Sequence, residues 1–317
     1  MILVTGATGF IGRRIVARLV ERGEEVRRLL RPVPNPRASG LPAVHFVTGD
    51  VTDPESLKAA CDGVDMVVHT VAIIREKGPV TFQALNVQGT RNVVEAAERA
   101  GVRKMVHLSA IGVRPDPKYP YLRSKWEGEE AVVNSNMEQV VLRPSLVFGP
   151  GDEFINALAA TTRVGPAVPF IGAGKARFQP IHVDDVAQCV DRALIDSSYN
   201  GETIEVGGPD VLTYGQITDM IIRAFGRRRM KVRVPTSMIR TALPLLKLVS
   251  PHPPITRVQL DMLGMDNVAA GGSVEANFDF KPRPLEGNID YILDMGWREA
   301  LSIATGLRPA RRWPVEE

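Results

Sequence analysis

Short apolar runs alternate with longer amphipathic segments through the first half of the chain. Aliphatic and β-branched residues gather in six short runs that predict strands, at residues 2–5, 26–30, 44–47, 66–69, 104–109 and 139–142. Between them, apolar residues recur every three or four positions, which predicts helices over 11–21, from 54 onward, over 82–100 and over 121–134. Strands that alternate with helices favour a parallel sheet with helices on both faces.

The pattern loosens after Pro150. Pro166, Pro169 and the glycines of 172–174 predict loops, and three more helices are predicted, over 183–194, 213–225 and 236–250. We therefore expect an α/β protein with a Rossmann-type, doubly wound parallel sheet and a smaller C-terminal lobe. The main domain would hold residues 1–150 plus about 181–205, and the smaller lobe would hold about 151–180 and 206–317.

Composition narrows the class of protein. The 317 residues include 39 Lys and Arg and 36 Asp and Glu. The resulting net charge of +3 is too small to indicate nucleic-acid binding. Two cysteines, Cys61 and Cys189, exclude a disulfide scaffold and the common zinc modules, and the five histidines show no metal-ligand spacing. No apolar run reaches the roughly 18 residues of a membrane span, and the N-terminus has no signal-peptide pattern. These features predict a cytoplasmic protein with no metal site. Three of the histidines lie in or beside strands, and we expect them to be structural residues with satisfied hydrogen bonds: His45, His69 and His107.

Three glycines follow the first predicted strand at a spacing of three and three, in the run Gly6-Ala7-Thr8-Gly9-Phe10-Ile11-Gly12. Gly6 allows the tight turn, Gly9 lets backbone N–H groups approach a pyrophosphate, and Gly12 lets the helix pack on the strand. The helix N-terminus favours an anion through its unpaired N–H groups and its dipole. The whole run, with Thr8, Phe10 and Ile11, is therefore predicted to hold the diphosphate of a dinucleotide.

The residue after the second strand bears on the choice between NAD and NADP. An acidic residue there would bind the ribose 2′-hydroxyl, but this chain has Arg31, which can pair with a 2′-phosphate. NADP(H) is therefore predicted over NAD(H), with a solvated surface arginine as the alternative. Asp50 and Val51 follow the third strand, where a carboxylate and an amide could reach the adenine edge; Asp50 could equally be a loop cap.

Tyr121 and Lys125 are four residues apart at the start of a predicted helix that follows the fifth strand. This spacing places both side chains on one helix face. A tyrosine hydroxyl can give a proton to a carbonyl oxygen as hydride arrives, and a neighbouring ammonium lowers the pKa of the phenol toward neutrality. The pair is therefore a candidate for acid–base catalysis.

Several motifs occur together and in a fixed order with the glycine run: residues 69–72 (HTVA), 86–92 (NVQGTRN), 121–125 (YLRSK), 142–150 (LRPSLVFGP) and 180–187 (PIHVDDVA). Through them the chain resembles the extended short-chain dehydrogenase/reductases, also described as NAD-dependent epimerase/dehydratase-like proteins, over about residues 1–205. The run from Tyr121 to Glu130 is most similar to the atypical branch that includes the dinucleotide-binding accessory subunit of respiratory complex I.

The resemblance implies roles for individual residues. Tyr121 would be the acid/base, and Lys125 would bind the nicotinamide ribose and tune Tyr121. Further contacts to the cofactor would come from Val71, Ala72, Asn86, Pro144 and Ser145. The family normally has a serine or threonine after the serine that follows strand five, but here Ser109 is followed by Ala110. Three alternatives follow for the missing hydroxyl donor. Ser109 or Ser145 replaces it, the protein is a weak enzyme, or the protein only holds its cofactor.

Two functions therefore stay open. One is an NAD(P)(H)-dependent oxidoreductase, or an epimerase-type enzyme with transient hydride transfer, that acts on a small molecule. The other is a cofactor-binding accessory or assembly protein. The segment 238–249 is apolar apart from Arg240 and Lys247. It would pack on the main domain, line an apolar substrate pocket, or dock on a membrane or a protein partner. The basic run 227–229 is predicted to be a solvated loop, with anion or membrane-surface contact as the alternative.

Overall fold

The structure, a computed structural model, describes residues 1–310 apart from 32–43, 173, 251, 254 and 273; the side chains of 246–249 are also outside the description. The chain forms two compact units. Unit 1 consists of Met1–Pro144, Val183–Val206 and Ala276–Asp279. Unit 2 consists of Ser145–His182, Gly207–Glu275 and the chain from Phe280 onward.

Unit 1 is built on a seven-stranded sheet in which every pair of neighbouring strands is parallel. Its strand order is β11-β6-β5-β4-β1-β2-β3, so the order reverses between β1 and β4. The strands are β1 (Ile2–Thr5), β2 (Val26–Leu30), β3 (Val44–Thr48), β4 (Met66–His69), β5 (Lys104–Leu108), β6 (Glu138–Pro144) and β11 (Thr203–Val206). The predicted doubly wound parallel sheet is confirmed, and ligands of such sheets bind at the carboxyl ends of the strands near the reversal point.

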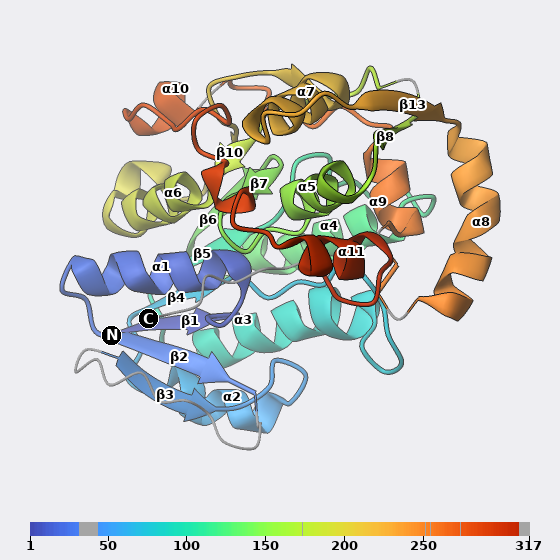
Figure 1. The fold of residues 1–317 in the computed structure, drawn as a ribbon. Coiled ribbons are helices and arrows are strands. Elements are labelled where there is room, and N and C mark those ends of the chain that lie inside the picture. Colours follow the sequence, from blue (N-terminus) through green and yellow to red (C-terminus); the bar gives the residue numbers. More distant parts are fainter. Residues whose placement is uncertain (32–43, 173, 251, 254, 273, 311–317) are drawn as a thin grey trace. The chain divides into compact units, whose positions relative to one another are not determined.

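Helices cover both faces of this sheet (Figure 1). Helix α1 packs against α6, whereas α2 packs against α3 and α3 against α4. The helices are α1 (Phe10–Glu21), α2 (Pro54–Cys61), α3 (Gly89–Arg99), α4 (Pro120–Val133) and α6 (Val183–Ile195), with a short 3₁₀ turn η2 (Ser197–Tyr199). Local signals begin and end several of them: the Asp53 carboxylate accepts the N–H of Glu55 to cap α2, and Gly23 follows α1 with φ +86°.

The single helix predicted over 82–100 is in fact two segments. Residues Gln83–Gln88 form a π-helical turn, η1, and the α-helix begins only at Gly89. A side chain at Gly89 would force a neighbour to shift, since its Cβ would lie 2.9 Å from Cγ2 of Val51. Such π turns are frequent at functional sites, and this one contains Asn86.

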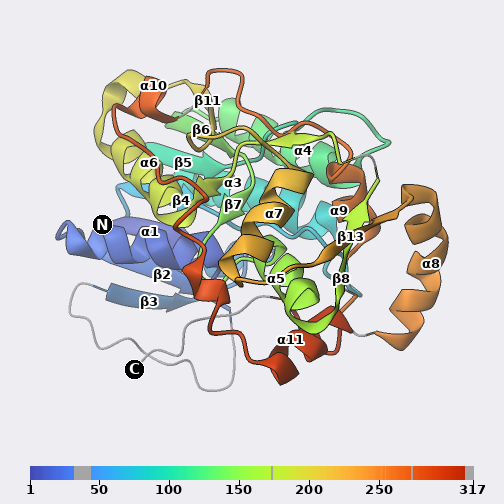
Figure 2. The ribbon, with the colours of Figure 1, turned by 45° about the horizontal axis from the view of Figure 1, so that its top comes forward.

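Unit 2 combines short strands with helices. Its strands are β7 (Val147–Phe148), β8 (Ala167–Ile171), β9 (Arg177–Phe178), β10 (Ile181–His182), β12 (Leu212–Thr213) and β13 (Met230–Val234). Its helices are α5 (Phe154–Val164), α7 (Tyr214–Ala224), α8 (Thr236–Val249), α9 (Arg257–Met262), η3 (Asp290–Ile292) and α11 (Trp297–Ala304); α10 (Val274–Phe278) has residues in both units. Helices α5, α7 and α11 surround one hydrophobic core, whereas α8 lies outside it and contacts α9 (Figure 2).

The loop predicted at Pro169 is wrong, because this residue lies within β8 and pairs with Val232 of the parallel strand β13. Proline cannot donate a backbone hydrogen bond, so it is confined to strands with an unpaired edge. Strand β8 has one neighbour only in its two-stranded ribbon, and the proline is tolerated there. The two cysteines, Cys61 and Cys189, are buried free thiols.

Candidate active site

The glycine run has a geometry that other residues cannot adopt. Gly6 directly follows β1 with φ +72°, and a Cβ there would lie 2.4 Å from Oγ1 of Thr70. A Cβ at Gly12 would lie 2.2 Å from the carbonyl oxygen of Gly6, so only glycine lets helix α1 approach the turn. The N–H of Gly9 closes the turn by donating to the Gly6 carbonyl at 2.8 Å.

The N-terminus of α1 is open to an anion. Its N-cap, Gly9, offers no side-chain hydrogen bond, and the first turn contains no acidic residue. Thr8 is exposed, while Phe10 and Ile11 are half-buried. The free N–H groups of a helix start together with the dipole favour a phosphate. The cradle that a Cβ would fill and the uncapped helix therefore fit the diphosphate of a dinucleotide.

Two sequence-predicted adenosine contacts have other partners in the structure. Oδ1 of Asp50 accepts both the N–H and the hydroxyl of Thr52, at 2.8 and 2.7 Å, which is the loop-cap alternative. Val51 is 3% exposed and belongs to the core of unit 1. Arg31 is exposed at the end of β2.

Asn86 joins two elements around the site. Its side-chain oxygen accepts the N–H of Ile73 at 2.9 Å, and its nitrogen donates to the Ile73 carbonyl at 3.1 Å and to the hydroxyl of Ser124 at 2.9 Å. The loop that contains Val71 and Ala72 is thereby tied to helix α4. Asn86 is 2% exposed and all its polar atoms are used, so its role in the structure is to position neighbouring segments.

Tyr121 lies in the first turn of α4, directly after Pro120, and its side chain is buried against the ring of Phe82. Burial raises the pKa of Tyr121 to about 12. The predicted lowering of this pKa by Lys125 is therefore wrong for the structure as it stands. The physical reason is that Nζ of Lys125 donates to the carbonyl oxygen of Leu108, at 2.6 Å, and the phenol is desolvated.

Lys125 shares the buried face of α4 with Tyr121 and is 3% exposed. Desolvation lowers the pKa of Lys125 to about 8, and the charge of Glu129 acts in the opposite direction. A lysine with a pKa in this range can carry or release a proton near neutral pH. The carbonyl it binds belongs to the last residue of β5, directly before Ser109.

Ser109 and Ser145, the two candidates for the missing hydroxyl donor, differ in their environment. Ser109 is buried, and its hydroxyl has no hydrogen-bond partner among the residues that the structure describes. The Ser145 hydroxyl, in unit 2, contacts the backbone oxygen of Asn267 at 2.7 Å and its side-chain oxygen at 2.8 Å. Pro144 ends β6, and its carbonyl accepts the N–H of Ile111. Ser109 is therefore the candidate with an unused hydroxyl.

His69 and His107 are a buried pair that the sequence did not assign to the site. They stand opposite each other on β4 and β5, and their rings stack with centroids 5.3 Å apart. The His69 ring contacts the hydroxyls of Thr5 and Thr90, at 2.7 and 3.1 Å, which confirms a satisfied structural role. Burial lowers the pKa of His69 to about 3 and the pKa of His107 well below its usual value, with the charge of Lys125 as a second cause in both.

The expectation of satisfied hydrogen bonds is wrong for His107, because neither ring nitrogen has a hydrogen-bond partner within the described part of the chain. The ring is fully buried in the sheet, where parallel strands offer their backbone groups only to each other. A sequence signal existed: both histidines stand at or near the end of a predicted strand, at positions that a parallel pair would align. His45, by contrast, is exposed on β3.

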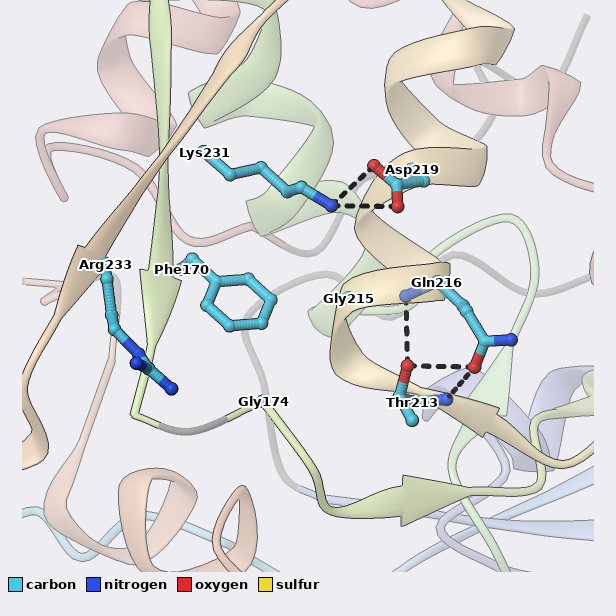
Figure 3. A pocket seen from close by; sticks show the side chains of 8 residues that line it. All are labelled: Phe170, Gly174, Thr213, Gly215, Gln216, Asp219, Lys231 and Arg233. Carbon is cyan, nitrogen blue, oxygen red and sulfur yellow. Dashed lines mark hydrogen bonds and ion pairs between the residues drawn. The ribbon is translucent and has the colours of Figure 1, made fainter.

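Unit 2 has a shallow hollow of about 310 Å³ that no sequence-predicted site residue lines (Figure 3). Phe170 forms its wall beside Gly174, whose Cβ would collide with the ring at 1.9 Å. Lys231 reaches both carboxylate oxygens of Asp219 at 2.9 Å, and Nε of Arg233 donates to the Gly172 carbonyl. Within the described residues, no group of three or more His, Cys, Asp and Glu side chains could hold a metal ion.

The parallel sheet, the glycine turn and the uncapped helix define a dinucleotide-binding protein of the Rossmann class. The chain belongs to the NAD dependent epimerase/dehydratase family, whose model matches residues 2–207. The resemblance to extended short-chain dehydrogenase/reductases is thus confirmed, and NAD-type dinucleotides are the cofactors of this family.

The relatives include both enzymes and subunits of a larger assembly. The chain is 28% identical to NADH dehydrogenase [ubiquinone] 1 alpha subcomplex subunit 9 of Arabidopsis thaliana, over 90% of this chain and 75% of that protein. It is 32% identical to sterol demethylase protein B of Methylococcus capsulatus, over 77% and 80%. Among solved structures, a dTDP-glucose 4,6-dehydratase double mutant from Streptomyces venezuelae with NAD bound is 25% identical, with a TM-score of 0.65 over 74% of this chain and 84% of that one. None of the helices that the structure describes is long and apolar enough to cross a membrane.

Proposed function

We propose that the protein is an NAD(P)(H)-dependent oxidoreductase in which Tyr121 transfers the proton that accompanies hydride transfer. The observation that carries this proposal is the arrangement of three buried groups near the carboxyl end of β5. Tyr121 and Lys125 share one face of α4, and Nζ of Lys125 binds the carbonyl next to Ser109, whose hydroxyl is unused.

A bound nicotinamide dinucleotide would supply or accept the hydride. Residues of the glycine turn and the first turn of α1 would hold its diphosphate, and Lys125 would hold its nicotinamide ribose. Tyr121 would protonate a substrate carbonyl oxygen, or take the proton from a hydroxyl in the reverse direction. Ser109 would donate a hydrogen bond to the same oxygen, in place of the donor that Ala110 lacks. A positioned donor of this kind is worth about 10²–10³ in turnover.

The pKa of Tyr121, about 12, opposes proton transfer at neutral pH. Lys125 has a pKa of about 8 and so is largely protonated at pH 7. Should Lys125 leave the Leu108 carbonyl and face the phenol when the active complex forms, its charge would lower the pKa of Tyr121. The pH profile of turnover should then contain an ionisation near that of Lys125.

A coenzyme preference for NADP(H) forms part of the proposal and rests on Arg31, which is exposed directly after β2. A guanidinium group can pair with the 2′-phosphate by charge-assisted hydrogen bonds. Calorimetry should give tighter binding of NADPH than of NADH, and Arg31→Ala should weaken NADPH binding by about tenfold. The affinity for NADH is the internal control and should not change. Equal affinities for the two coenzymes in the unmodified protein would remove the preference.

The central experiment compares Tyr121→Phe with the unmodified protein. Coenzyme binding is measured by calorimetry, and turnover is measured with a panel of ketones and alcohols. The panel includes sterols, because a relative from Methylococcus capsulatus is a sterol demethylase protein. We expect unchanged coenzyme affinity and a loss of about 10²–10⁴ in kcat, the usual contribution of a positioned acid or base. The matched control is Tyr119→Phe, which alters a half-buried tyrosine two residues earlier and should leave kcat unchanged.

A second candidate function is that of a cofactor-binding accessory protein located in the cytoplasm or on a larger complex. Ala110 and the raised pKa of Tyr121 favour it, and relatives from Arabidopsis thaliana and Neurospora crassa are complex I subunits. If Tyr121→Phe retains both coenzyme binding and the cellular phenotype of the native protein, this second function replaces the first.

A further inference from the structure

One segment of unit 2 concentrates positive charge. Residues 220–260 contain nine lysines and arginines and no aspartate or glutamate. The whole chain has a net charge of only +3, so the remaining residues carry a net charge of −6. So uneven a distribution produces a local positive potential although the molecule is nearly neutral.

The same segment exposes large apolar side chains. On strand β13, Met230 is 70% exposed and Val232 46%; on helix α8, Met238 and Leu245 are each 65% exposed. Among the side chains of α8 that the structure describes, Leu243 alone is buried. Isolated apolar residues on a surface are ordinary, but four of them within sixteen residues, between exposed cations, are not.

We propose that the exposed apolar residues Met230, Val232, Met238 and Leu245 dock on an anionic lipid bilayer, with Arg227 and Arg228, in the loop before β13, as the cations that meet lipid phosphates. Met238 and Leu245 are seven residues apart on α8 and so share one helix face. In a membrane interface, apolar side chains enter the acyl boundary and nearby cations pair with lipid phosphates. An anionic bilayer is the occupant that this combination fits, because it offers an acyl boundary to the apolar side chains and phosphates to Arg227 and Arg228.

The nearby carboxylates do not cancel this charge. Asp219 pairs with Lys231, and Asp261 pairs with Arg240, but the cations remain 38% and 55% exposed in these pairs. Exposed ion pairs contribute only about 0–1 kcal/mol, so these cations still add to the positive potential of the segment. Both acidic residues flank the acid-free segment.

A second apolar group lies at the end of α8. The hydroxyl of Ser250 and the N–H of His252 both donate to the Gly306 carbonyl, at 2.9 Å, which ties the end of α8 to the turn after α11. Trp297 and Leu307, at either end of α11, are 54% and 62% exposed. Tryptophan is typical of membrane–water interfaces. These residues would extend the bilayer contact beyond α8.

Vesicle flotation with the full-length protein tests the proposal. We expect binding to vesicles of phosphatidylcholine with 30% phosphatidylglycerol, and at least about tenfold weaker binding to pure phosphatidylcholine or at high salt. Arg227→Gln and Arg228→Gln together should weaken binding by roughly fivefold per arginine. Leu245→Asp and Met238→Asp should each weaken it by at least about tenfold.

The matched control is Ile195→Asp, which places the same charge at a residue of unit 1 that is 64% exposed. This variant should float like the unmodified protein. Dinucleotide binding by each variant confirms that it is folded, and this readout does not depend on the docking surface. Failure to float with anionic vesicles, or equal loss in Ile195→Asp and Leu245→Asp, would overturn the proposal. A dimer in light scattering that Leu245→Asp dissociates, without vesicle binding, would assign the surface to a second copy of the chain instead.

Discussion

Replacement of His107 by leucine is expected to stabilise the protein, and the gain should grow as the pH falls. The His107 ring is fully buried on β5, and neither nitrogen has a hydrogen-bond partner among the described residues. A buried polar group without a partner costs about 1–3 kcal/mol, and leucine is similar in size without carrying that cost. Loss of the stacking on His69 removes about 0.5–1.5 kcal/mol. The net gain at pH 7 is therefore about 1 kcal/mol.

The pH dependence gives the sharper test. Burial lowers the pKa of His107 well below 6.5, so the unfolded chain binds a proton below pH 6.5 that the folded chain does not bind. Stability that is present above this pH is consequently lost as the pH falls. At pH 5 the loss is about 2 kcal/mol for each histidine that stays neutral. His69, with a pKa of about 3, behaves in the same way, so both together cost about 4 kcal/mol.

The assay is urea unfolding of the whole protein at pH 7 and pH 5, followed by the fluorescence of Trp126 on α4 after the other two tryptophans are replaced by phenylalanine. The two neutral histidines together lower the free energy of unfolding between pH 7 and pH 5, and His107→Leu should halve this decrease. His69→Leu should also reduce that loss, but should destabilise the protein at pH 7, because Thr5 and Thr90 lose their partner. An identical pH slope with and without His107 would falsify the assignment of a neutral, buried ring.

Three further predictions concern the packing around the site. Gly12→Ala should weaken dinucleotide binding by more than about 100-fold and lower stability, since its Cβ would lie 2.2 Å from the Gly6 carbonyl oxygen; calorimetry and thermal unfolding measure both. Lys125→Met should raise stability at pH 7 by about 1–3 kcal/mol while turnover is lost, because a buried ammonium with a lowered pKa opposes folding. Glu129→Gln should lower the free energy of unfolding in urea by about 2 kcal/mol, because Arg143, three-quarters buried, would lose its charged partner. A decrease below about 0.5 kcal/mol would contradict a stabilising role for this pair.

Much of unit 1 could be predicted from the sequence because its signals are local. Strands buried on both faces of a parallel sheet read as short apolar runs, and β1 and β4 have the predicted bounds; β2 has them as well, although it contains two arginines and is only partly buried. Asp53 and Gly23 mark a helix start and a helix end through their own backbone and side-chain chemistry. The glycine turn is a local signal as well, because the spacing of its glycines follows from the geometry of the turn itself.

Unit 2 was less predictable because its strands depend on distant partners. Strand β8 pairs with β13, which lies more than fifty residues later in the chain, and Pro169 within it favoured a loop. Helix α5 is apolar on several faces because it packs against both α7 and α11, so its periodicity is weak. In unit 1, the seventh strand of the sheet, β11, was missed because it is short and pairs only with β6 at the edge of the sheet.

The amino-acid sequence by itself determined six of the seven strands in the sheet of unit 1, the glycine turn after β1, and the Tyr121–Lys125 pair on one helix face. Each of these follows from residue spacing within a few turns of helix or one strand. Only the tertiary structure decided which polar groups are satisfied: Asn86 and Ser145 are fully engaged, whereas Ser109 and His107 are buried without partners among the described residues. Hydrogen-bond partners and burial come from segments far apart in the chain, and these contacts set the pKa of each group in the site.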